Sequence, residues 1–106
     1  MQLLTEAIKK ALPPLGWTED IPTENKEFIC KFFNPLGVGS WLVAEGEEQE
    51  DGDWLFFGLA NIFHPEWGYF SLRELEEVGV GLGLGIERDI CYGSEDLHPE
   101  WKSKNA

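Results

Sequence analysis

Basic residues are scarce in this sequence of 106 residues: eight Lys and Arg stand against twenty Asp and Glu, for a net charge of −12. A protein that grips nucleic-acid phosphates needs a basic surface, so we expect no direct binding of nucleic acid. No apolar run approaches the roughly 18 residues of a membrane-spanning helix, and no apolar stretch of signal-peptide length follows a basic start. We therefore expect neither a membrane partner nor secretion.

Cysteine is almost as scarce, with only Cys30 and Cys91 in the chain. Two cysteines are too few for a disulfide framework, which favours a reduced, cytoplasmic environment. Cys30 lies in a strand-like run of apolar residues and is expected to be a small buried side chain.

The rest of the composition is that of a globular domain, with 42% hydrophobic and 13% aromatic residues. The length is that of one small domain. We expect a single domain over residues 1–92 and a polar C-terminal tail over residues 93–106. The glycine-rich stretch 79–85 cannot hold a helix and is expected to form an apolar loop.

The apolar periodicity predicts helices and strands in alternation. The expected elements are, in chain order, a helix between Thr5 and Pro13, strands at residues 27–33, 40–45, 53–62 and 67–70, a helix from Ser71 to about Val78, and a strand at residues 86–92. Connections of hairpin length between the strands favour an antiparallel sheet. The predicted fold class is thus α+β, with an antiparallel sheet of four to five strands and two helices.

Local signals support the two helices. Thr5 is a suitable N-cap for the first, and proline at position 13 ends it because proline lacks a backbone donor. Ser71 and Glu74 have the spacing of a capping box at the start of the second helix. Leu72, Leu75 and Val78 are expected to face inward from that helix.

The acidic excess is concentrated in the second half of the chain. Residues 45–100 contain fifteen acids against two arginines, or −13, and six of these acids fall within the nine residues 45–53. One interpretation is a solvated hairpin tip that favours solubility. The other is a surface that imitates a phosphate backbone and engages a basic cleft of a nucleic-acid-binding protein.

A second acidic group, Glu87 and Asp89, flanks Arg88. On a strand the two carboxylates would share one face, where they could hold a divalent cation. The alternative, which we favour, is that Arg88 forms internal ion pairs.

Several segments together resemble a known family. They are Leu3-Leu4, Lys10-Ala-Leu-Pro-Pro14, Lys31-Phe-Phe33, Asp53-Trp-Leu-Phe-Phe-Gly58, Glu66-Trp-Gly-Tyr-Phe-Ser-Leu-Arg-Glu-Leu-Glu-Glu77 and Gly83-Leu-Gly-Ile-Glu-Arg-Asp89. In order and content they resemble small bacterial proteins catalogued as a domain of unknown function and common on plasmids, conjugative elements and phages. The resemblance implies no catalytic residues. It implies a mobile element as the setting, where small acidic proteins counter host defence.

The leading hypothesis is a non-enzymatic acidic binding protein that engages a basic protein surface, with no cofactor, no metal site and no catalytic residue. The residues expected to carry binding are Glu45, Glu47, Glu48, Glu50, Asp51, Asp53, Trp67, Tyr69 and Arg88, because the acids supply the field and aromatics and arginine dominate interface energy. One alternative is a carboxylate-dependent metal enzyme in which Glu87, Asp89 and Asp53 hold the ion. Another is a homodimeric plasmid-maintenance module.

Overall fold

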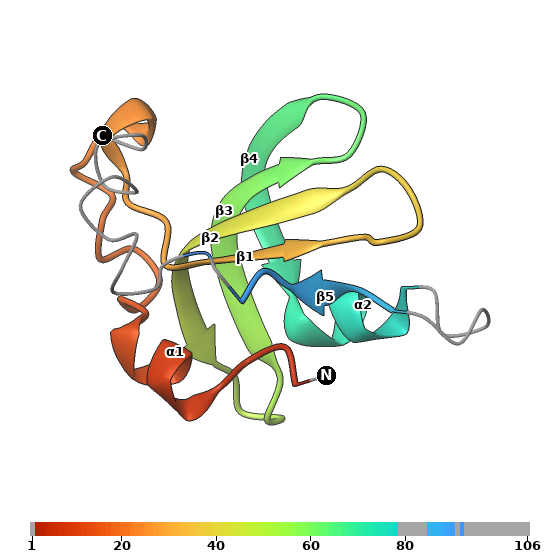
Figure 1. Ribbon diagram of the computed structural model, residues 1–106. Helices are drawn as coiled ribbons and strands as arrows, with labels where there is room; N and C mark the ends of the chain where they lie inside the picture. Colours follow the sequence, from red (N-terminus) through yellow and green to blue (C-terminus); the bar gives the residue numbers. More distant parts are fainter. Residues whose placement is uncertain (1, 79–84, 91, 93–106) are drawn as a thin grey trace.

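One antiparallel sheet of five strands, in the order β4-β3-β2-β1-β5, organises the part of the chain that the computed structural model describes, residues 2–78, 85–90 and 92 (Figure 1). The elements are α1 (Glu6–Ala11), the short 3₁₀ helix η1 (Thr23–Asn25), β1 (Cys30–Phe33), β2 (Ser40–Glu48), β3 (Trp54–Asn61), β4 (Pro65–Ser71), α2 (Leu72–Glu77) and β5 (Glu87–Arg88). Strands β1 to β4 follow one another as neighbours, and β5 returns to pair with β1 at the opposite edge. The predicted α+β class is confirmed.

Both helices begin at the expected caps. The Thr5 hydroxyl accepts a hydrogen bond from the backbone N–H of Ile8 at 3.2 Å, and the Ser71 hydroxyl accepts one from the N–H of Glu74 at 3.2 Å. Leu75 is buried, as expected, but Val78 is exposed. The inward orientation predicted for Val78 is wrong because the helix ends at residue 77 and the chain leaves the helical path there.

Strand β2 is longer than predicted and continues to Glu48 instead of ending at residue 45. A β-bulge between Val43 and Glu45 shifts the register, after which β2 continues to pair with β3. Bulges accommodate one extra residue and increase local twist. The loop expected at residues 46–52 is therefore shorter, and much of the acidic run belongs to a paired strand.

The other strand boundaries also differ from the prediction. β1 begins at Cys30 and not at residue 27, and β5 is confined to Glu87–Arg88. β4 begins at Pro65, two residues earlier than predicted. Proline is acceptable there because β4 is an edge strand and Pro65 is its first residue.

One face of the sheet, here called the core face, holds the main hydrophobic core. Phe32, Val43 and Phe56 have no exposed surface, and Cys30 is 2% exposed beside them. Burial raises the pKa of the Cys30 thiol to about 12, against the opposing effect of the Arg88 charge. Cys30 is therefore an apolar core residue. The residues that cover this face come from the segments on either side of α1, from α2 and from the residue before β5: Leu3, Leu4, Leu12, Leu75 and Ile86.

The opposite face, here called the open face, is covered only in part. Phe28 and Ala44 are buried on it, with Leu42, Leu59 and Trp67 packed against them. In Figure 1 both helices lie at the lower end of the sheet, where the β2–β3 hairpin also turns. The glycine-rich segment at residues 79–84, Cys91 and the tail at residues 93–106 lie outside the described residues.

Candidate functional site

The β2–β3 hairpin presents most of the acidic run to solvent. Glu47, Glu48, Glu50 and Asp51 are exposed and Asp53 is half-buried. The turn is closed by a hydrogen bond from the Gln49 N–H to the Asp53 carbonyl at 2.7 Å. Residues 47–53 are called the acidic hairpin below. The structure thus places five of the predicted binding residues on one hairpin.

Arg73, in the first turn of α2, binds this hairpin. Its Nη1 lies 3.0 Å from Asp51 Oδ2, its Nη2 lies 2.8 Å from the Asp51 carbonyl oxygen, and its backbone N–H donates to Asp53 Oδ1 at 3.1 Å. A hydrogen bond from the Asp53 backbone N–H, and then the Arg73 guanidinium, hold the pKa of the Asp51 carboxyl below its usual value. Among the residues that the structure describes, Arg73 is the one base that forms an ion pair with these five acids, so the hairpin stays strongly negative.

Glu45 is separated from the other acids of the run because it is buried, with 3% of its surface exposed. Its carboxylate accepts hydrogen bonds from the backbone N–H groups of Gly16 at 2.8 Å and Thr18 at 2.9 Å, and from the Thr18 hydroxyl. Burial by itself raises the pKa of the Glu45 carboxyl, but these hydrogen bonds and the Lys26 charge outweigh it and lower the pKa. The Glu45 carboxylate therefore faces the chain and not a partner.

Lys26 completes this buried polar network, with only 4% of its surface exposed. Its ammonium donates to the Thr18 carbonyl oxygen and, at 3.0 Å, to the Thr18 hydroxyl. The same ammonium lies 5.9 Å from the centre of the Phe57 ring. The network fixes the segment that follows α1 against the open face. Sequence reasoning did not find it, because its members are up to 29 residues apart.

Beside this network the open face is hollowed. A cavity of about 360 Å³ is lined on one side by the segment between α1 and β1 and on the other side by the sheet. We call it the aromatic hollow, and its lining comprises Gly16, Glu19, Ile21, Pro22, Thr23, Lys26, Glu45, Phe57 and Tyr69. Tyr69 is 66% exposed, and its ring centre lies 5.1 Å from that of Phe57 at an interplanar angle of 56°.

Trp67 has a different environment from Tyr69, although both were predicted to anchor a partner. The Trp67 ring stacks on Phe28 at 5.5 Å and on Phe57 at 5.7 Å. It packs within the second hydrophobic cluster and is half-buried. The surface of Trp67 is therefore largely used within the fold, whereas most of Tyr69 is free to contact a partner.

A second hollow lies on the same face of the sheet. It has a volume of about 530 Å³ and is lined by Gln49, Glu50, Asp51, Asp53, Leu55 and Ser71. The register pairs Tyr69 with Phe57, and the next pair on the same face is Ser71 with Leu55. Since alternate residues of a strand share a face, the acidic hairpin continues into the aromatic hollow along one surface.

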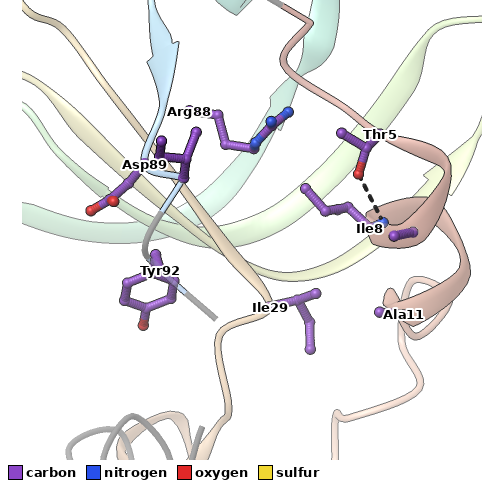
Figure 2. Close-up of a pocket in the computed structure, with 9 residues that line it drawn as sticks. Thr5, Ile8, Ala11, Ile29, Arg88, Asp89 and Tyr92 are labelled. Carbon is purple, nitrogen blue, oxygen red and sulfur yellow. Dashed lines mark hydrogen bonds between the residues drawn. The ribbon is translucent and has the colours of Figure 1, made fainter. Parts of the chain in front are cut away.

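Arg88 is remote from this surface. It lies on β5, at the edge of the sheet opposite β4. Its Nη1 donates to the backbone carbonyls of Gln2 and, at 3.3 Å, Leu3. Figure 2 shows its guanidinium directed toward Thr5 at the start of α1, above a cavity of about 270 Å³. The structure does not bring Arg88 together with the acidic hairpin or with Tyr69.

Of the carboxylates considered as metal ligands, Asp53 lies apart from Glu87. Asp53 precedes β3, whereas Glu87 lies on β5, three strands away in the sheet and hence separated by roughly 14 Å. Among the residues that the structure describes, no three His, Cys, Asp or Glu side chains are grouped so that they could hold a metal ion. In the same part of the chain, no helix has the length and apolar character needed to cross a membrane.

Comparison with known proteins identifies one family. A family model described as "Protein of unknown function (DUF2958)" matches residues 3–104. No curated protein and no solved structure is significantly similar to the chain.

Proposed function

The chain belongs to the DUF2958 family, whose function is unknown, so we propose a function from the surface of the protein. It is a non-enzymatic binding protein that docks its acidic hairpin onto a basic surface of another protein. The observation that carries this proposal is the exposure of Glu47, Glu48, Glu50 and Asp51 on one hairpin. In the described part of the chain, Arg73 is the one base that forms an ion pair with it. Electrostatic attraction of this kind accelerates encounter and selects partners of opposite charge.

The partner that best fits this surface is a protein that itself handles nucleic acid. Duplex DNA carries about one negative charge per 1.7 Å of axis, and a hairpin with five acids in seven residues offers a comparable local density. A cleft built for phosphates would accept it as a decoy. The resemblance to proteins of plasmids, conjugative elements and phages supports a host defence protein as the partner.

The test uses the immobilised protein to capture basic nucleic-acid-binding proteins at low and at high salt. The binding variant is Glu47→Gln/Glu48→Gln/Glu50→Gln. The matched control, Glu24→Gln/Glu76→Gln/Glu77→Gln, removes the same charge from exposed positions outside the hairpin. We expect capture by the wild type to fall at high salt. At low salt, we expect capture to fall in the hairpin variant and to be unchanged in the control variant.

Competition with duplex DNA tests the decoy part of the proposal. If the captured protein is released by DNA, the hairpin occupies its nucleic-acid site. Capture that neither salt nor the hairpin variant reduces would contradict the proposal as a whole. Capture that is sensitive to charge but indifferent to DNA would contradict the decoy and leave a basic surface of another kind.

A further inference from the structure

The aromatic hollow contains a mostly exposed aromatic ring, Tyr69. Phe57 is packed between Trp67 and Tyr69, and Tyr69 forms the outer wall with two thirds of its surface exposed. Across the hollow, Ile21 is also exposed. A concave apolar wall with a few polar groups at its rim is the usual form of a binding site.

The charges around the hollow favour a positively charged ligand. Lys26 contributes little outward field, because it is buried, bound to Thr18 and close enough to Glu45 to lower that carboxyl's pKa. Glu19 is exposed on the rim. Glu47 lies one pair further along β2 on the same face, since Glu45 pairs with Phe57 and Glu47 with Leu55. With Lys26 balanced by Glu45, the charges of Glu19 and Glu47 leave the surroundings of the hollow with a net negative charge.

We propose that the aromatic hollow binds the guanidinium group of an arginine side chain from the partner, stacked on Tyr69 and paired with Glu19. Arginine fits better than lysine because its planar group stacks on an aromatic ring while its fork of donors reaches a carboxylate. This inference rests on the proposed function and names the side chain that the basic partner inserts beside the acidic hairpin.

The direct test is an NMR titration of the whole protein with three peptides: acetyl-Gly-Arg-Gly-amide, the same peptide with lysine, and the same peptide with citrulline, the neutral isostere of arginine. We expect amide shifts at residues 19–21, 23, 57 and 69, with affinity in the order arginine, lysine, citrulline. Equal binding of citrulline and arginine, or shifts only elsewhere, would overturn the proposal.

Variants assign the binding to the named side chains. Tyr69→Ala and Glu19→Gln should each weaken the arginine peptide about three- to fivefold, the size expected of an exposed cation–π contact or ion pair. Tyr69→Phe keeps the ring and should bind like the wild type. Glu76→Gln, on α2, removes one exposed charge outside the hollow and is the matched control. Unchanged binding by Tyr69→Ala, with its fold verified by circular dichroism, would refute the assignment.

Failure of this inference is distinguishable from failure of the proposed function. If the hairpin variant abolishes capture of basic proteins while Tyr69→Ala retains it, the acidic surface stands and the arginine site is wrong. If the arginine peptide binds at Tyr69 while no basic protein is captured in a charge-dependent way, the arginine site stands and the docking function is wrong.

Discussion

Glu45 and Glu47 lie two residues apart on β2, yet their carboxylates have different environments and different roles. Glu47 is exposed on the acidic hairpin, whereas Glu45 is buried and accepts three hydrogen bonds from Gly16 and Thr18. A buried carboxylate is tolerated only when such bonds replace its lost hydration. Glu45 is therefore a folding residue within a run of acids whose other members face solvent.

Substitution of the two glutamates should separate these roles. Glu45→Gln removes the charge that strengthens the bonds to Gly16 and Thr18, and we expect it to lower the free energy of unfolding by about 1–3 kcal/mol at pH 7. Glu47→Gln has the same chemistry at an exposed site and should change stability by less than about 0.5 kcal/mol. Urea denaturation followed by tryptophan fluorescence measures both. Equal effects would contradict the network.

The Glu45 carboxylate also predicts how the free energy of unfolding depends on pH. The pKa of the Glu45 carboxyl is lowered in the folded protein, so its contribution is complete above the unfolded value of about 4.3 and is lost as pH falls through the folded pKa. The stability difference between wild type and Glu45→Gln should therefore be constant near neutral pH and shrink below about pH 4. A difference that widens on acidification would contradict the lowered pKa.

Gly58 is a second residue whose role depends on its neighbours. A Cβ atom at Gly58 would lie 1.9 Å from the Leu42 carbonyl oxygen, whereas one at Gly68, its partner on β4, would meet nothing within 4 Å. We expect Gly58→Ala to destabilise the protein by about 3 kcal/mol and Gly68→Ala to be nearly neutral. Thermal unfolding of the two variants checks this contrast. Similar melting temperatures would show that the sheet can relax around Gly58.

At this scale the sequence predicted some features and missed others for a definite reason. Cys30 was assigned to the core, and Ser71 to a cap, from neighbours within a few residues. The burial of Glu45 depends on Gly16 and Thr18, 29 and 27 residues earlier in the chain. Local pattern carries no information about which distant backbone donors meet a carboxylate, so Glu45 was grouped with the exposed acids.

At the scale of elements, the alternation of apolar and polar residues predicted the sheet and both helices correctly but placed several ends wrongly. β2 extends to Glu48 because a bulge at Val43/Glu45 restores pairing with β3 after a shift. A run of acids normally indicates a loop. Pairing with the apolar strand β3 overrides that local preference, and pairing is a property of two segments and not of one.

The N-cap of α2 lies next to the residue through which this helix binds the acidic hairpin. Ser71 caps the helix through its hydroxyl, and two residues later Arg73 binds Asp51. We expect Ser71→Ala to cost about 1 kcal/mol and to raise hydrogen exchange at α2. Ser71→Thr keeps a hydroxyl at the cap and should retain most of the stability. Faster exchange in the hairpin as well as α2 would show that Arg73 transmits the loss. Exchange unchanged in α2 would contradict the role of the cap.

The candidate site combines two elements that sequence analysis treated separately. The acidic hairpin was recognisable because its five acids fall within seven residues. The aromatic hollow was not, because it forms where the segment between α1 and β1 lies against Phe57 and Tyr69. That segment is interrupted by three prolines and has no regular apolar periodicity, so only the fold shows that it borders a cavity.

At the scale of the whole molecule, a charge of −12 acts within a chain of 13.4 Å radius of gyration. At low ionic strength most of these charges interact, because the screening length of about 30 Å at 0.01 M salt exceeds this radius. Mutual repulsion of like charges destabilises the compact state. The acidic hairpin concentrates that repulsion, so the charges to which we assign the proposed binding oppose stability.

Salt should therefore stabilise the protein and, under the proposed function, weaken its docking at the same time. Raising NaCl from about 0.01 M to about 0.15 M shortens the screening length to about 8 Å, and we expect the melting temperature to rise by roughly 5 °C, equivalent to about 1 kcal/mol in a domain of this size. Glu47→Gln/Glu48→Gln/Glu50→Gln relieves the repulsion in advance, so it should melt higher at low salt and gain less from added salt. The control Glu24→Gln/Glu76→Gln/Glu77→Gln loses the same net charge from dispersed positions and should gain more from salt than the hairpin variant. If salt raises the melting temperature of both variants equally, net charge alone governs stability. If the melting temperature falls as salt is added, attractive ion pairs outweigh the repulsion that we assign to the hairpin.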